Sequence, residues 1–460
     1  MAVSTSARFS LSSDSVEALR RQISGSVLLN NEDGFDAART IWNAMIDRSP
    51  TLIVQPASTA DVVAAVRFAA EQDLPIAVRG GGHNVAGLAI CDDGLMIDLS
   101  RMRRVDVDPE RKTARAQGGA TWGDFDAATA AHGLATTGGA ISTTGIGGLT
   151  LGGGLGNLMR SYGLACDNLL SCEVVTANGD VVTAGTAENP DLFWGLRGGG
   201  GNFGVVTMFE YRLHPVSQVL GGLLMFPIDR ARDLIRLYRQ VTASAPDALG
   251  AAFTVTHAPD GTPVCALAIC YNGPIDEGER AIKPFRDFGT PIAGAVGPVP
   301  YTATQTMVDE AFPPGLQNYW RSHFLTDLTE EGMDILIDQF SRVSSPLAGI
   351  LIEDLGGAVA RVSPDATAFN FRDYTYNLAI LGRWADPSQA DAGIAWTRGV
   401  HEAMQPFAAG VYVNYLSVGE QADRVRAAYG EEKYARLVEL KNRYDPTNRF
   451  PFNQNIAPSA

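Results

Sequence analysis

A histidine that directly follows three glycines is the first feature of this sequence with chemical potential. The stretch 75–84 reads PIAVRGGGHN, so an apolar, strand-like run is followed by Arg79, Gly80, Gly81, Gly82, His83 and Asn84. Glycines let backbone N–H groups approach a ligand closely, and successive N–H groups form a concavity that suits phosphate. A phosphate site beside a reactive imidazole is one interpretation. A glycine turn with a solvated histidine fits this stretch equally well.

A second glycine-rich stretch spans residues 138–163 and reads GGAISTTGIGGLTLGGGLGNLMRSYG. Flexible linkers are rich in glycine and polar residues, whereas here apolar residues such as Ile146 and Leu151 are interleaved with the glycines. We therefore expect buried loops that pack against something flat and turn backbone donors toward a ligand. A purely structural role would leave many buried N–H groups to satisfy.

A third glycine cluster, residues 199–204, matches the dinucleotide pattern G-x-G-x-x-G. That motif needs a strand before it and a helix after it. Here residues 191–196 favour a helix and residues 205–211 favour a strand, so the order is reversed. We therefore do not interpret this cluster as a Rossmann dinucleotide site, although it can still contact a cofactor.

Short helices and strands alternate in the first half of the chain, which is typical of an α+β fold. Apolar periodicity predicts helices over 13–24, 59–72 and 122–132, and strands over 74–78, 95–99, 105–107, 113–117, 173–177 and 181–183. Ser58 or Thr59 is the expected cap of the second helix. These elements must position the glycine-rich stretches.

The pattern changes at about residue 215, where apolar strands alternate with amphipathic helices. We expect strands over 220–226, 250–256, 264–271, 349–355 and 374–381, helices over 230–243 and 329–343, and a sheet covered by helices. Residues 410–415 read as another strand and 431–443 as a helix. The predicted domains are 1–214, 215–405 and a C-terminal segment, 406–460, that returns to the first.

Composition excludes several classes of partner. The net charge of −15 argues against nucleic acid and anionic membranes, and no run approaches the ~18 apolar residues of a membrane-spanning helix. Five cysteines without a C-x-x-C pair, and no apolar secretory segment, indicate a reducing cytoplasm. The histidines lack ligand spacing, so we expect no metal site.

Six motifs together resemble one family: VRGGGHN (78–84), GIGGLTLGGGLG (145–156), YGLACDNLLS (162–171), DLFWGLRGGGGNFGVVT (191–207), YVNY (412–415) and YDPTNRF…NQNI (444–456). The chain resembles the berberine-bridge-enzyme-like FAD-linked oxidases of the vanillyl-alcohol-oxidase superfamily, especially bacterial 6-hydroxynicotine-oxidase-like and oligosaccharide-oxidase-like members. The resemblance implies a two-lobed, PCMH-type FAD-binding domain and a substrate domain with an antiparallel sheet covered by helices.

The resemblance also implies FAD between the two lobes, bonded covalently through its 8α-methyl group to His83. Imidazole is nucleophilic enough to attack an electron-poor flavin. By the same resemblance, the other cofactor contacts are Arg79, Gly80, Gly81, Gly82, Asn84, Gly139, Ser142, Thr143, Gly145, Gly147, Gly148, Gly152, Gly153, Gly156, Tyr162, Asp167, Gly204, Val205, Val206, Asn414, Asn453 and Asn455.

Many relatives form a second bond from a cysteine in a C-P-T-x-G-x-G-G segment. The aligned position here is Ile141, which cannot form a thioether, so we predict one covalent link only. Cys166 lies nearby in the sequence, but a buried structural thiol is the favoured interpretation for it.

The family reaction oxidises a C–H bond next to O or N while a base removes the O–H or N–H proton. Plant relatives place an acidic or amide residue where this chain has Ala379, so tyrosines are the candidates here: Tyr412, Tyr415 and Tyr374. One of Tyr412 and Tyr415 should face the flavin, with its pKa lowered from ~10, for example by Arg372. Tyrosines packed in a core are the rival interpretation. Tyr376 and Glu353 are further candidates, and a lone glutamate is more often a solvated strand end.

These observations predict an FAD-dependent oxidase of a small alcohol, sugar or amine, with O2 as electron acceptor. A flavin dehydrogenase of the same fold and a non-catalytic flavoprotein are the alternatives. The sequence predicts neither the substrate's identity nor the oligomeric state.

Overall fold

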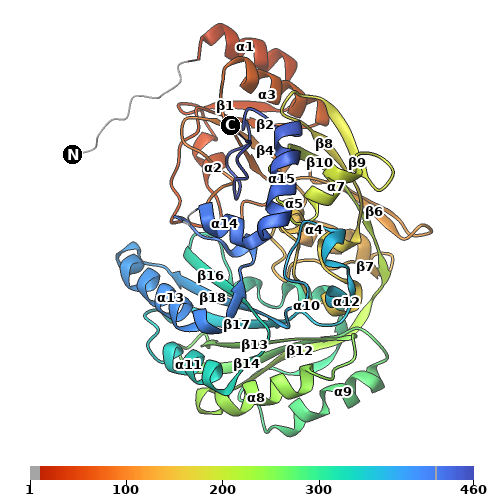
Figure 1. The fold of residues 1–460 in the computed structure, drawn as a ribbon, viewed down its shortest axis with the longest axis vertical. Helices are drawn as coiled ribbons and strands as arrows, with labels where there is room; N and C mark the ends of the chain where they lie inside the picture. Colours follow the sequence, from red (N-terminus) through yellow and green to blue (C-terminus); the bar gives the residue numbers. More distant parts are fainter. Residues whose placement is uncertain (1–10, 420–421, 460) are drawn as a thin grey trace.

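A computed structural model describes residues 11–419 and 422–459 of the chain. Three large sheets organise it, with the N-terminal sheets and the C-terminal helices at one end and the third sheet at the other (Figure 1). Helices and antiparallel sheets are mixed, which confirms the α+β class. The domain boundaries after residues 214 and 405 stay predictions.

The first sheet has the order β1-β2-β4-β3, with β1 antiparallel and the other strands parallel. Ser58 begins the main covering helix as expected, because its hydroxyl accepts the N–H of Asp61 at 3.3 Å. The elements are α1 (Ser13–Gln22), β1 (Ser26–Leu29), α2 (Phe35–Arg39), β2 (Leu52–Gln55), α3 (Thr59–Glu71), β3 (Ile76–Arg79) and β4 (Leu95–Asp98).

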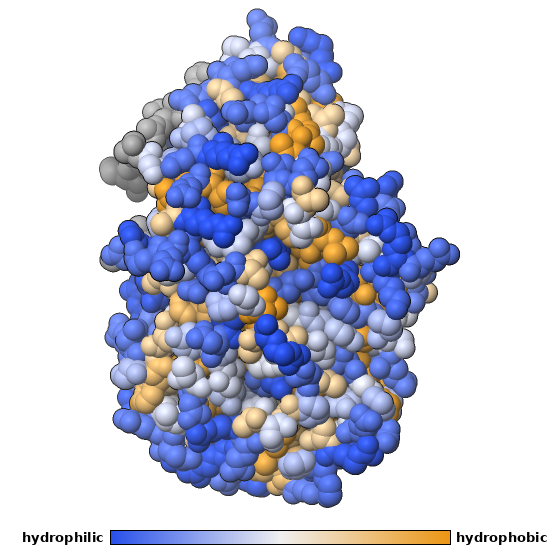
Figure 2. Space-filling model, turned by 45° about the vertical axis from the view of Figure 1, so that its right-hand side comes forward, coloured by the Kyte–Doolittle hydropathy of each residue, from blue (hydrophilic) through white to orange (hydrophobic). Residues whose placement is uncertain are grey.

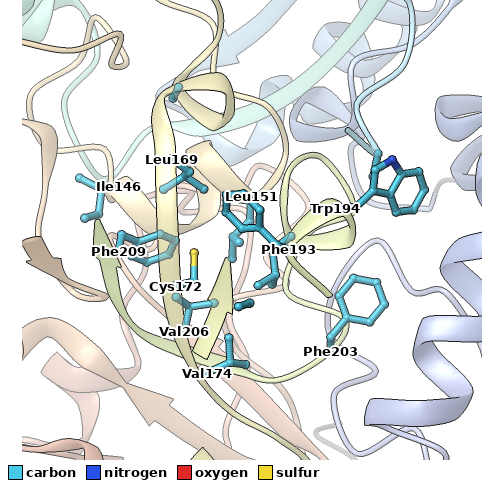
Figure 3. Close-up of a cluster of buried hydrophobic side chains, with 14 of the residues drawn as sticks. Ile146, Leu151, Leu169, Cys172, Val174, Phe193, Trp194, Phe203, Val206 and Phe209 are labelled. Carbon is cyan, nitrogen blue, oxygen red and sulfur yellow. The ribbon is translucent and has the colours of Figure 1, made fainter. Parts of the chain in front are cut away.

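The second sheet is antiparallel, in the order β5-β6-β10-β8-β9. Its apolar face contacts the short helices of the glycine-rich stretches, as Ile146, Leu151 and Phe209 illustrate (Figure 3). The elements are β5 (Val105–Asp108), β6 (Thr113–Gln117), α4 (Trp122–Ala130), β7 (Leu134–Ala135), α5 (Ile146–Leu151), α6 (Met159–Tyr162), β8 (Leu169–Val175), β9 (Val181–Gly185), α7 (Pro190–Leu196) and β10 (Val205–Arg212). The helix–glycine–strand order around residues 199–204 confirms that this cluster is no Rossmann motif.

The third sheet has eight antiparallel strands in the order β15-β12-β14-β13-β17-β18-β16-β19. Helices α8, α9, α11 and α13 cover its outer face (Figure 1). The short strand β11 (His214–Pro215) pairs with β7. The elements that follow it are β12 (Gln218–Pro227), α8 (Ala231–Thr242), β13 (Leu249–His257), β14 (Pro263–Tyr271), α9 (Ile275–Asp287), β15 (Val296–Pro300), α10 (Tyr301–Thr306), β16 (Gln317–Leu325), α11 (Glu330–Phe340), β17 (Gly349–Asp354), α12 (Ala358–Arg361), β18 (Tyr376–Trp384), α13 (Ala390–Met404) and β19 (Ala408–Gly410).

One expectation about this sheet was wrong, and one of its strands was not predicted. The strand predicted over 410–415 ends at Gly410, and Val413–Tyr415 form a 3₁₀ turn, because the Asn414 amide bonds the Leu149 carbonyl at 3.1 Å and bends the chain toward the glycine loops. Strand β16 was missed altogether. Its sequence, QNYWRSHFL, is polar enough to hide a buried strand that pairs with β18 along its full length.

The C-terminal helices α14 (Ala422–Tyr429) and α15 (Glu431–Tyr444) pack against the second sheet. Lys441 and Asp445 are fully buried and 2.7 Å apart, and the Asp445 carboxylate accepts the N–H of Phe450 at 2.9 Å. Phe450 in turn lies in the core of the first sheet. This ion pair therefore ties the C-terminal segment to both N-terminal sheets.

The face of the molecule shown in Figure 2 is largely hydrophilic, with hydrophobic residues scattered between the hydrophilic ones. Among the residues that the structure describes, no helix has the length and apolar character needed to cross a bilayer.

Lys441→Met should lower the free energy of unfolding by about 3–5 kcal/mol, because it leaves the Asp445 charge buried without its partner. The urea midpoint of the purified protein measures this. Arg443→Met, an exposed position on the same helix, is the matched control, and adding Asp445→Asn to Lys441→Met should recover part of the loss. Equal midpoints for the two single variants would contradict the prediction.

Candidate active site

A cavity of about 1000 Å³ separates the glycine-rich stretches from the inner face of the eight-stranded sheet. This volume is at the upper end of the range for ligand sites. One wall is built from residues 80–84, 139–156 and 200–204, and the other from inward-facing residues of β13, β17, β18 and β16. The lining is mainly apolar, with a few polar groups concentrated at separate places.

The glycine wall depends on a direct backbone contact. A Cβ added to Gly81 would lie 2.2 Å from the Gly145 nitrogen, and one added to Gly145 would lie 2.2 Å from the Gly81 nitrogen. Gly148, by contrast, faces open space within the cavity. In the described part of the chain, the N–H groups of Gly81, Gly82 and His83 find no protein acceptor. Unpaired N–H groups at a cavity wall are suited to a ligand's oxygen atoms.

His83 stands at the rim of this wall, half-buried and stacked on Trp42 with ring centres 4.9 Å apart. Its Nε2 lies 3.0 Å from the Thr143 hydroxyl and its Nδ1 3.4 Å from that of Thr144. Burial lowers the pKa of His83 to about 4, so the imidazole is neutral at pH 7 and one ring nitrogen carries a lone pair. Such a ring is a nucleophile.

Glu353 provides a carboxyl group on the opposite wall. It alternates with Ile350 and Ile352, which face the covering helices, so its side chain points into the cavity. Asn377 is paired with Glu353 on the neighbouring strand β18, and its side-chain amide donates to the Glu353 carboxylate at 2.7 Å. Burial raises the pKa of Glu353 to about 7. The expectation of a solvated strand end was therefore wrong for this residue.

Tyr412 and Tyr415 both line the cavity, with ring centres 5.0 Å apart, and Tyr415 also packs edge-on against Trp320. The Tyr412 hydroxyl accepts the Gly154 N–H at 3.0 Å and the Asn414 amide at 2.9 Å. Burial raises the pKa of both tyrosines rather than lowering it.

Arg372, the cation expected to lower a tyrosine's pKa, is ion-paired with Asp167 at 2.6 Å instead. The Asp167 carboxylate also accepts the backbone N–H of Leu164 at 2.9 Å, so this pair fixes the loop that follows the second glycine stretch. The positive charge of Arg372 is therefore neutralised by Asp167 and is not directed at the tyrosines.

Most of the residues predicted to bind a cofactor line the cavity: Gly80, Gly81, Gly82, His83, Asn84, Gly139, Gly145, Gly147, Gly148, Gly152, Gly156, Gly204, Val206, Asn414 and Asn453. The other predicted cofactor contacts are not among the lining residues: Arg79, Ser142, Thr143, Gly153, Tyr162, Asp167, Val205 and Asn455. Tyr162, for instance, stacks on His214 with ring centres 3.8 Å apart. Tyr374, predicted as a catalytic candidate, does not line the cavity either.

The two positions considered for a second link differ in environment. Ile141 lines the cavity, whereas Cys166 is a buried thiol whose pKa is raised by burial. Burial of Cys166 agrees with the structural interpretation. No cluster of His, Cys, Asp and Glu in the described residues could hold a metal ion.

Several residues of the site were not anticipated from the sequence. Phe312, Trp320 and Arg383 line the cavity, whereas Trp42 and Asn377 contact the lining residues His83 and Glu353. Trp320 and Arg383 occupy inward positions of β16 and β18, and their alternation could have been read only once both strands were known. Trp42 and Phe312 lie in loops, where no sequence periodicity indicates that they belong to the site.

Comparisons with known proteins agree with this geometry. The family model described as "FAD binding domain" matches residues 50–185, and the model "Berberine and berberine like" matches residues 411–457. An FAD-linked oxidoreductase of Dictyostelium discoideum is 34% identical over 91% of this chain and 91% of its own length. The (R)-6-hydroxynicotine oxidase of Paenarthrobacter nicotinovorans is 31% identical, covering 95% of this chain and 97% of that protein.

Among solved structures, 6-hydroxy-D-nicotine oxidase from Arthrobacter nicotinovorans superposes with a TM-score of 0.86 at 28% identity. The match covers 95% of this chain and 98% of that one. The cavity fits FAD: its glycine wall presents unpaired N–H groups, and a Cβ at Gly81 would collide with backbone. Residues 80–84 and 145–156 are the ones that would hold it.

Two glycine substitutions should distinguish glycines that are needed for stability from glycines that leave room for the ligand. Gly81→Ala should destabilise the protein by about 1–3 kcal/mol, because its methyl group meets backbone. Gly148→Ala should keep the unfolding midpoint, because alanine favours helix α5, yet lower the flavin content, because its methyl group enters the cavity. Thermal melts and flavin absorbance measure both. Full flavin content in a folded Gly148→Ala protein would show that the ligand lies elsewhere.

Proposed function

Because the chain belongs to the berberine-bridge-enzyme-like FAD-linked oxidoreductases, we propose that it oxidises a C–H bond next to oxygen or nitrogen in a small alcohol, sugar or amine, with O2 as electron acceptor. FAD supplies the hydride acceptor in such chemistry. One observation carries the proposal: a neutral imidazole and a carboxyl group with a pKa near 7 face the same cavity from opposite walls.

We assign the covalent flavin link to His83 alone. Its ring is neutral, its orientation is fixed by Trp42 and the threonines at 143 and 144, and it lies beside the unpaired N–H groups of the glycine wall. Ile141 offers no sulfur for a second link.

His83→Ala should remove an FAD-sized increment from the intact mass of the denatured protein, whereas His214→Ala should retain it, because His214 stacks on Tyr162 outside the cavity. An increment that survives in His83→Ala would move the link to another residue. Protein that carries no flavin, bound or released by acid, would overturn the proposed function itself.

For the base, the observations favour Glu353 over the tyrosines. A general base works best when its pKa lies near the working pH, and burial places Glu353 at about 7 while raising the pKa of Tyr412 and Tyr415. The Asn377 amide holds the carboxylate in one orientation. Tyr412 and Tyr415 then orient the substrate, with Tyr412 fixed by Gly154 and Asn414. Tyr374, which packs against Phe371, is not among the residues that line the cavity.

Glu353→Gln should slow anaerobic flavin reduction by about 10²–10⁴-fold, the usual contribution of a positioned base. In the wild type the rate should rise with pH through about 7, because only the ionised carboxylate accepts a proton, and this rise should vanish in the variant. Stopped-flow absorbance across pH measures both. Tyr415→Phe is the control, and a larger loss there would assign the base to tyrosine.

The acceptor is tested on the same instrument. Mixing reduced protein with aerated buffer should restore flavin absorbance within milliseconds to seconds if O2 is the acceptor. Reoxidation over minutes would make the protein a dehydrogenase.

A further inference from the structure

Arg383 presents an uncompensated positive charge to the cavity. It lies on β18, is 6% exposed and lines the cavity. Its Nε donates to the Leu347 carbonyl at 2.8 Å and its Nη1 to the Ala311 carbonyl at 2.5 Å, while the guanidinium carbon lies 4.1 Å from the ring centre of Phe312. Two neutral carbonyls and an aromatic face fix the group without neutralising it.

Other deeply buried arginines of this protein have carboxylate partners. Arg160 is paired with Asp354, and Arg372 with Asp167. Among the described residues, no carboxylate lies within ion-pair distance of Arg383. Burial lowers its pKa to about 10, so the group stays ionised at neutral pH. Burying an ion without a partner is costly, which indicates that this site has a partner when it works.

The guanidinium also has unused donors. It carries five N–H groups, and the two carbonyls of the loops at 311 and 347 occupy only part of them. The surrounding lining is apolar, with Phe312, Pro346 and Leu381 among the neighbours in the cavity wall. A charged hydrogen bond in such surroundings is stronger than one in water, so an anion that enters here gains both charge balance and bidentate geometry.

Arg383 and the Glu353–Asn377 pair occupy separate ends of the same wall. Asn377 and Arg383 are six residues apart on β18 and face the same side, which places their backbones roughly 20 Å apart. Ala379 and Leu381 lie between them, with Leu351 alongside. A substrate that contacts both ends must therefore have an apolar middle.

We propose that Arg383 binds a carboxylate at one end of an otherwise apolar substrate, whose other end carries the C–H bond that is oxidised near Glu353. The inference rests on the proposed function and narrows it from alcohols, sugars and amines in general to acid-bearing ones. Arg383 acts in recognition, at a distance from the reacting bond.

The test compares carboxylic acids with their uncharged amides as probes of the flavin-loaded protein. Phenylacetate, 4-phenylbutyrate and 6-phenylhexanoate, each with its amide, are titrated while the flavin spectrum is recorded. In the wild type at least one acid should bind about tenfold to a hundredfold more tightly than its amide, the value of a hydrogen bond to a charged group. In Arg383→Gln the two should bind equally, and Arg383→Lys should be intermediate.

Arg361→Gln is the matched control, because it removes the same charge from an exposed residue outside the cavity lining. If Arg383→Gln does not fold, Arg383→Lys and the wild-type comparison decide. The proposal is overturned if no acid is preferred over its amide by the wild type, or if the preference survives in Arg383→Gln. It is also overturned if that variant loses flavin, which would make Arg383 a cofactor contact. Wild-type protein without flavin would instead refute the proposed function.

Discussion

The contact between the backbones of Gly81 and Gly145 is the constraint on which the rest of the site depends. Neither residue can carry a side chain, because a Cβ on either would lie 2.2 Å from the other's nitrogen. The contact joins the loop after β3 to the loop before α5, and so joins the first sheet to the second. His83, two residues beyond Gly81, is thereby held at a fixed place opposite the third sheet.

The third sheet lies across the cavity from the glycine wall and contributes side chains to the site. Its inner face carries Glu353, Asn377 and Arg383 among small and apolar neighbours, while its outer face is sealed by four helices. The two walls therefore contribute different chemical groups. One provides backbone donors and an imidazole, and the other provides a carboxyl group, an amide and a guanidinium.

The sequence predicted the glycine wall well because its chemistry is local. Glycines, the histidine after them and the capping serine of α3 act within a few residues, and their expected positions agree with the structure. The side-chain wall was harder, because burial there depends on strands that meet from distant parts of the chain. Glu353 was named only as a further candidate beside the more common solvated strand end, since nothing near it in sequence shows that β18 and the glycine loops enclose it. Strand β16 was missed because Arg321 and His323 interrupt its apolar pattern.

The links across the cavity have a consequence for how molecules reach it. Asp309 of the segment between β15 and β16 accepts the Ser142 N–H at 2.8 Å, Gln305 bonds Asp126 and the Gly139 carbonyl, and Asn43 bonds the Asn318 carbonyl at 2.9 Å. A hinge that swung the walls apart would break all of these together, each at a net cost of about 1 kcal/mol. The spacing between the two walls is therefore held by several hydrogen bonds acting together, so molecules reach a cavity of fixed width.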